Sequence, residues 1–142
     1  MIKIRILLAL TVLPFLACAQ NSEQEKQEIK TAVLGYIENF FLNDYNNMEK
    51  HLHDRLAKRG VNQDGTLSEE YPKPALKALM NNKQALPLNL QSNKVDSIFM
   101  DRNFASVILS TGYPGLKWKE YIHLAKLEGE WLIMDVFWNF EE

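Results

Sequence analysis

The sequence predicts an α+β domain in which helices pack on one face of an antiparallel sheet. Apolar residues recur at a helical spacing in the first half of the chain, and beyond Pro87 they alternate as in strands. The third observation is the segment 117–138, which is typical of two strands joined at Glu128-Gly129, where glycine supplies the positive φ of a tight turn.

Residues 1–19 have the features of a secretory signal peptide. Lys3 and Arg5 precede an apolar run, and Ala17-Cys18-Ala19 offers a small-x-small cleavage site. We expect cleavage after Ala19 and export to the periplasm or the medium, with no membrane span, because a span needs about 20 apolar residues. In the alternative, Cys18 ends a lipobox and anchors a lipoprotein. Either route leaves the folded domain without a cysteine for a disulfide or a nucleophile.

The remainder of the chain predicts a short polar tether at residues 20–26 and one domain at residues 27–142. The net charge of the whole chain is −2, and no stripe of lysine and arginine is present. Nucleic acid is therefore not an expected partner. The sequence also lacks a phosphate loop and a dinucleotide fingerprint, so we expect no cofactor.

The helices are expected in the first two thirds of the chain. An apolar stripe predicts a helix over 24–43, and Asp44 is placed as the N-cap of a second, short helix that ends near His53. A short strand at 54–61 and a loop at 62–65 follow. Pro72 and Pro74 then favour a helix start, and the helix is expected over 74–81.

Four strands are expected after Pro87: 93–100 and 104–111, which turn at Arg102-Asn103, and then the final hairpin. A two-residue turn at Glu128-Gly129 predicts the following opposed residues: Leu127 with Glu130, Ala125 with Leu132, His123 with Met134, and Tyr121 with Val136. Both faces of this hairpin are apolar, whereas one face of an antiparallel hairpin is usually wet. Helices are expected to cover one face, and a second copy of the chain the other.

Several segments resemble one family. They are Tyr36-Ile37, Phe40-Phe41, 48–49, 53–59, 105–107, 121–127, Gly129-x-Trp131 and 136–138. Together they are similar to nuclear-transport-factor-2-like domains, the cone-shaped α+β fold shared with ketosteroid isomerases and polyketide cyclases, and most similar to the putative lumazine-binding group. In that group a proline commonly follows the histidine that matches His53, and here Asp54 stands instead. The resemblance implies a curved antiparallel sheet with three helices on one face, a pocket under the helices, and often a homodimer through the outer sheet face.

Aromatic and polar residues of the helices and the hairpin are candidates for lining such a pocket. A flat apolar or aromatic ligand is the expected occupant, although the same residues are also typical of core packing. The predicted lining is Tyr36, Phe40, Phe41, Tyr45, His53, Tyr121, His123, Met134 and Trp138.

His123 and Asp135 are the candidates for proton transfer. An imidazole titrates near neutral pH, and a carboxylate on an apolar face has a raised pKa. The alternatives are a hydrogen-bonded core histidine and a partly exposed aspartate. The predicted register places the two residues on opposite faces, so they are not expected to form a dyad.

The remaining polar candidates predict less. His51 and His53 lie two residues apart and lack a third ligand at suitable spacing, so no metal site is expected. Arg55 and Arg59 could bind an anionic ligand, but with Lys58 they are more typical of a solvated basic patch.

These observations lead to three hypotheses of function. The first is an exported, non-catalytic small-molecule-binding or accessory domain. The second is an isomerase, dehydratase or cyclase that uses His123 or Asp135. The third is a structural dimerisation module without a ligand.

Overall fold

The computed structural model describes the backbone of residues 5–141 and the side chains of residues 22–141. The predicted signal peptide, its cleavage site and the lipidation alternative at Cys18 lie outside the residues whose side chains are described. The elements in chain order are α1 (Arg5–Leu42), α2 (Tyr45–Met48), η1 (Glu49–His51), β1 (Leu52–Val61), α3 (Lys73–Asn81), η2 (Leu88–Leu90), β2 (Lys94–Asp101), β3 (Phe104–Tyr113), β4 (Leu116–Leu127) and β5 (Glu130–Phe140).

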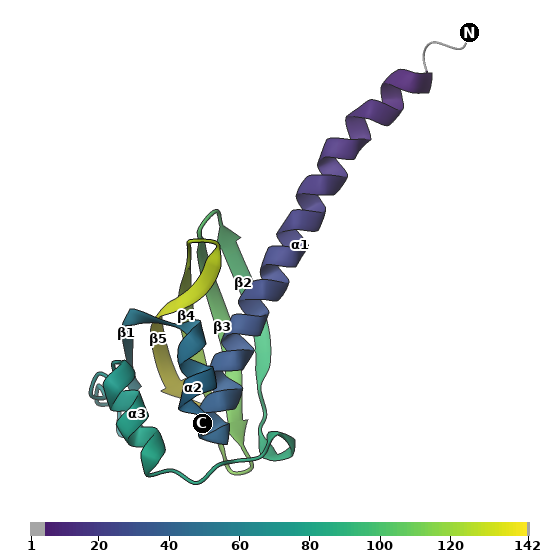
Figure 1. Ribbon diagram of the computed structural model, residues 1–142. Helices are drawn as coiled ribbons and strands as arrows, with labels where there is room; N and C mark the ends of the chain where they lie inside the picture. Colours follow the sequence, from purple (N-terminus) through teal and green to yellow (C-terminus); the bar gives the residue numbers. More distant parts are fainter. Residues whose placement is uncertain (1–4, 142) are drawn as a thin grey trace.

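The strands form one five-stranded sheet in the order β1-β5-β4-β3-β2. The pairs β2–β3, β3–β4 and β4–β5 are antiparallel, and β1 runs parallel to β5. The sheet is curved, and α1, α2 and α3 lie on its concave side (Figure 1). The predicted α+β class and the cone-shaped arrangement of helices on one sheet face are confirmed.

Helix α1 carries most of the helical part of the core. Its apolar stripe is buried as predicted: Ile29, Val33, Tyr36 and Ile37 have no exposed surface, and Phe41 has 2%. Residues 22–26 of the predicted tether are part of α1, where Lys26 pairs with Glu23 at a one-turn spacing. No helix in the described part of the chain is long and apolar enough to cross a membrane.

Asp44 caps the helix that follows α1, as predicted: its carboxylate accepts a hydrogen bond from the backbone N–H of Asn47 at 3.1 Å. The end of this segment was predicted wrongly. α2 ends at Met48, a 3₁₀ turn follows, and strand β1 already begins at Leu52, so His53 lies in a strand. Leu52 and Leu56 are buried among the core residues, which favours an extended chain over a continued helix.

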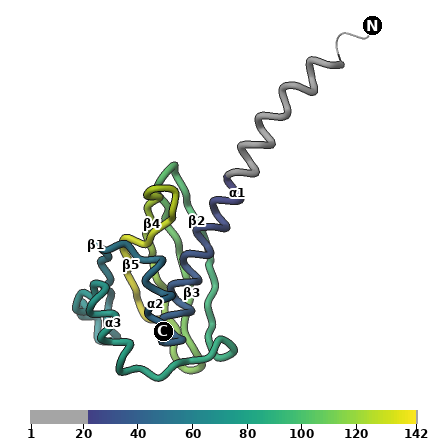
Figure 2. Tube along the Cα trace, in the orientation of Figure 1, coloured from purple at the N-terminus to yellow at the C-terminus, as the bar shows by residue number. Residues whose placement is uncertain are grey.

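After α3 the chain passes from the β1 edge of the sheet to the opposite edge, where β2 begins (Figure 2). On its way it passes the end of α1, where the backbone N–H of Leu86 donates to the carbonyl of Phe41 at 2.7 Å. This hydrogen bond fixes the connection to the C-terminal end of α1.

The turn of the final hairpin is as predicted, with Glu128 and Gly129 both at positive φ (51° and 89°). Leu127 lies opposite Glu130 and Ala125 opposite Leu132, also as predicted. Beyond this point the predicted register is wrong by one residue, because a β-bulge leaves Met134 without a partner: His123 pairs with Asp135 and Tyr121 with Phe137. The bulge turns Phe137 to the outer face and Trp138 to the concave face.

Candidate functional site

Three rows of residues cross the concave face of the sheet near the C-terminal ends of β1 and β5. Lys58, Val136, Ile122 and Val107 form one row from β1 to β3. Gly60, Trp138, Glu120 and Leu109 form the next row, and Phe140, Trp118 and Thr111 the last. Opposed residues in a sheet point to the same face, so these rows aim one lysine, one glutamate and three large aromatic rings at α1 and α3.

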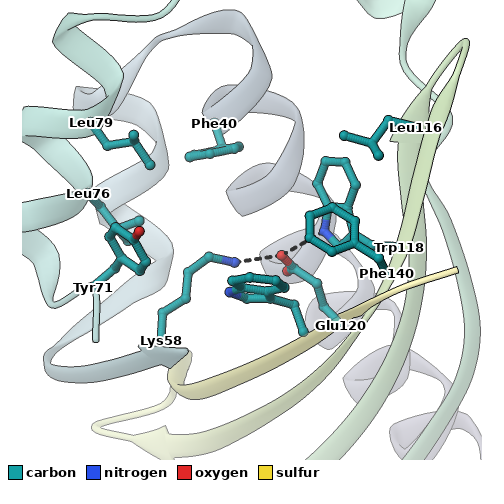
Figure 3. Close-up of a pocket in the computed structure, with 10 residues that line it drawn as sticks. Phe40, Lys58, Tyr71, Leu76, Leu79, Leu116, Trp118, Glu120 and Phe140 are labelled. Carbon is teal, nitrogen blue, oxygen red and sulfur yellow. Dashed lines mark hydrogen bonds and ion pairs between the residues drawn. The ribbon is translucent and has the colours of Figure 1, made fainter. Parts of the chain in front are cut away.

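A pocket of about 200 Å³ lies between these rows and the helices (Figure 3). Its lining combines the aromatic rows with residues of α1, α3 and the loop before α3: Phe40, Lys58, Tyr71, Leu76, Leu79, Leu116, Trp118, Glu120, Trp138 and Phe140. A cavity of about 150 Å³ holds benzene, so this pocket suits a molecule of one or two rings.

The aromatic side of the pocket is built from rings in edge-to-face contact. The centroid of Phe140 lies 6.2 Å from that of Trp118 and 5.3 Å from that of Trp138. The Trp138 indole lies directly over Gly60, where a Cβ atom would come within 2.2 Å of the ring. The glycine of β1 therefore makes room for this side of the pocket.

A buried polar cluster stands at the pocket wall. The Lys58 Nζ donates to Glu120 Oε1 at 2.6 Å and to the Tyr36 hydroxyl at 2.7 Å. The Trp118 Nε1 donates to the same Glu120 oxygen at 3.2 Å. Lys58 is 6% exposed and Glu120 1%, so this ion pair is almost fully withdrawn from water. Burial, and after it the charge of Glu120, raises the pKa of the Tyr36 phenol well above its ordinary value, so the phenol stays protonated.

A second lysine lies close to the pocket. The Lys83 Nζ lies 3.6 Å from the ring centroid of Phe40 and 5.4 Å from that of Phe41. Burial, together with repulsion from Lys58, lowers the pKa of this amine to about 8. With Lys58 and Lys83 against Glu120, the electrostatic balance around the pocket favours a positive potential.

The structure brings only part of the predicted lining to the pocket. Phe40 and Trp138 line it, and Tyr36 lies behind it in the polar cluster. Phe41 is buried and packs against Trp118 with centroids 5.7 Å apart, and Tyr45 packs at the edge of the core.

The other predicted lining residues lie elsewhere. Tyr121 and His123 point to the outer face of the sheet, and both are exposed. Met134 forms the bulge, and the ring Nδ1 of His53 accepts a hydrogen bond from the backbone N–H of Arg55 at 3.1 Å, outside the pocket. The two-residue alternation of the sequence correctly indicated which residues of β4 share a face. It failed for β5, because the bulge reverses the faces of the residues after Met134.

His123 and Asp135, predicted on opposite faces, are neighbours on the outer face. The His123 Nδ1 lies 3.9 Å from Asp135 Oδ2, and Arg59 donates to Asp135 Oδ1 at 3.1 Å. The prediction was wrong because Met134 shifts the register. The pair does not border the pocket, and Arg59 is already engaged by a carboxylate.

Lys58 and Glu120 are the residues that sequence analysis missed. Lys58 was assigned to a solvated basic patch with Arg55 and Arg59, but it is buried. In β1, Lys58 lies on the same face as Leu56 and Gly60, which are two residues away on either side. In β4, Glu120 lies on the same face as Ile122 and Leu124. The two-residue period of a strand therefore places each charge on an apolar face. This period was the sequence feature that could have indicated the burial of both residues. Within the part of the chain whose side chains are described, no group of three potential ligands could hold a metal ion.

Comparison with known proteins identifies the family. A family model described as putative lumazine-binding matches residues 24–139. No curated protein matches the chain.

Solved structures share the fold at low sequence identity. An NTF2-like protein of unknown function from Shewanella baltica OS155 is 21% identical with a TM-score of 0.73, over 84% of this chain and 95% of that one. An NTF2-like protein of unknown function from Silicibacter pomeroyi DSS-3 is 14% identical with a TM-score of 0.75, over 84% and 98%. A ketosteroid isomerase-like protein from Erwinia carotovora atroseptica is 12% identical with a TM-score of 0.61, over 80% and 94%. These structures show that the chain shares the fold of NTF2-like proteins. Since the family model spans most of the chain, this protein belongs to the putative lumazine-binding family.

Proposed function

We propose that this protein is an exported, non-catalytic binding or accessory domain whose small ligand occupies the pocket between α3 and the sheet. The observation that carries the proposal is the pocket itself, with leucines and aromatic rings on most of its wall and one buried ion pair. Ligand sites in proteins commonly combine an apolar lining with a few fixed polar groups. The family description supports a small molecule as the ligand.

An enzyme based on His123 or Asp135 has less support, because both residues lie on the sheet face opposite the pocket. A ligand held in the pocket is separated from them by the sheet.

Thermal stabilisation by a panel of flat aromatic and isoprenoid compounds tests the proposal. Ligands that bind only the folded state raise the melting temperature with concentration. Leu79→Trp should fill the pocket from α3 and abolish the shift, whereas Leu88→Trp, at an exposed leucine outside the lining, should keep it. No shift with any compound, or an equal shift in both variants, would contradict binding in this pocket.

A second candidate function, homodimerisation, is favoured by the outer sheet face. In the single chain this face exposes Phe99, Phe104 and Tyr121 by 64%, 46% and 46%. Neighbouring large apolar side chains at a surface are typical of interaction sites. We propose that a second copy covers them.

Light scattering across a dilution series tests the dimer. The expected result is a dimer for the unmodified chain and a monomer for Phe99→Lys, with Leu88→Lys as the matched control that stays dimeric. A monomer at every concentration of the unmodified chain would contradict the proposal.

Export through cleavage after Ala19 is the third part of the proposal. The mass of the mature protein from the cell envelope should correspond to an N-terminus at Gln20. A chain that begins at lipid-modified Cys18 would instead support the lipoprotein alternative.

A further inference from the structure

Only one of the two carboxylate oxygens of Glu120 accepts hydrogen bonds. Its Oε1 accepts from Lys58 at 2.6 Å, from Trp118 at 3.2 Å and from the Tyr36 hydroxyl at 3.4 Å. Its Oε2 is equally buried and receives no hydrogen bond from any residue whose side chain the structure describes. An ionised carboxylate can accept hydrogen bonds at both oxygens, so half of this group's capacity is unused.

An unused buried acceptor is unfavourable, since it has lost its bonds to water without gaining others. Glu120 lines the pocket, and Figure 3 shows its carboxylate inside the ring of lining side chains, between Lys58 and Trp118. Oε2 itself has almost no exposed surface, so a ligand in the pocket reaches it when a neighbouring lining side chain shifts, and no group outside the pocket is better placed to donate to it.

The surrounding charges restrict what kind of donor fits. Lys58 already neutralises Glu120, and the half-buried Lys83 adds a positive charge nearby. A cationic ligand would meet a carboxylate that is already neutralised and would be repelled by Lys83, and an anionic ligand would bring a second negative charge against Oε2. A neutral N–H or O–H group meets neither penalty.

We propose that the ligand of this pocket is a neutral molecule of one or two flat apolar rings that carries a hydrogen-bond donor, and that Glu120 Oε2 accepts this hydrogen bond. The inference rests on the proposed binding function and specifies its ligand class. Leucines and aromatic rings bind the ring system, and Glu120 selects the donor.

Isothermal titration with isosteric pairs tests it. Indole and benzofuran share one shape, and only indole has an N–H; 2-naphthol and 2-fluoronaphthalene form a second pair that differs in an O–H. In the unmodified protein at least one donor should bind about tenfold or more tightly than its isostere, as expected for a hydrogen bond to a charged group. In the double variant Lys58→Met/Glu120→Leu the ratio should fall to about one.

The outcomes separate the inference from the proposed function. Donor and isostere that bind equally well to the unmodified protein would overturn the inference and leave pocket binding intact. Binding of no compound from either pair would overturn both. A preference that persists in the double variant would also overturn the inference, because the donor would then bond elsewhere. The unmodified protein alone suffices for the first two results, so the test does not depend on the folding of the variant.

Discussion

Lys58 of β1 and Glu120 of β4 meet above β5, the strand between them, with 2.6 Å from Nζ to Oε1. The free energy needed to remove two charges from water offsets much of the free energy gained from their attraction. Apolar replacements of similar size therefore often leave stability unchanged or improved. The pair is therefore not needed for a stable fold, which agrees with the role in ligand recognition that we propose for Glu120.

Lys58→Met or Glu120→Leu alone should lower the free energy of unfolding by about 3–5 kcal/mol, because each leaves one uncompensated buried charge. The double variant should be close to the unmodified protein. Urea unfolding of the four proteins measures this. If the single losses simply add in the double variant, the charges are not coupled.

Gly60→Ala should displace both the Trp138 indole and the backbone of β5, since the new Cβ would come within 2.2 Å of the ring and of the Trp138 carbonyl oxygen. We expect a loss of about 1–3 kcal/mol in stability and weaker binding of pocket ligands. Adding Trp138→Leu should recover part of the stability, although not the binding. Denaturant unfolding and titration of one ligand measure the two effects. An unchanged Gly60→Ala variant would contradict the described packing of the ring.

Lys83 provides a pH-dependent prediction. Its pKa of about 8 in the folded protein lies below the ordinary value of 10.5, so between these pH values the unfolded chain holds a proton that the folded chain has released. The unfavourable contribution of Lys83 is therefore complete below pH 8 and relieved as the pH rises to 10.5. Lys83→Met should be more stable than the unmodified protein at pH 7, by ~1 kcal/mol after solvent screening at this half-buried site.

The difference in free energy of unfolding between these two proteins should shrink toward pH 10.5. Titration of the Lys83 side-chain NMR signals gives the pKa directly. A pKa near 10.5, with no pH dependence in the stability difference, would show that the amine is fully hydrated.

His123→Ala should leave ligand binding unchanged and alter stability by less than about 0.5 kcal/mol, because His123 is an exposed side chain 3.9 Å from its aspartate partner. Trp138→Ala, on the concave face, should abolish binding. Titration of a pocket ligand into both variants compares them. Loss of binding in His123→Ala would contradict this prediction and indicate that His123 takes part in ligand binding.

The sequence predicted the elements well because their signals are local. The apolar stripe of α1, the Asp44 cap and the Glu128-Gly129 turn each depend on residues close in the chain. Each of these predictions was confirmed.

The site was harder to predict, because one unpaired residue determines it. Met134 has no sequence feature that marks a bulge, yet it reverses the facing of Phe137 and Trp138 and joins Asp135 to His123. Strand pairing between β1 and β5 also depends on a long connection, so the approach of Lys58 to Glu120 is invisible to a local pattern. For Lys58 and Glu120, the only sequence feature that indicated burial was that each lies on the apolar face of its strand.

The most direct test of the pocket uses the indole N–H signals of the three tryptophans during an NMR titration with 2-naphthol. Trp118 and Trp138 line the pocket, and Trp131 does not. We expect saturable shifts of the Trp118 and Trp138 signals with Trp131 unaffected. Shifts confined to Trp131, or no shift of any indole signal up to the solubility limit, would contradict the assignment of this pocket as the binding site.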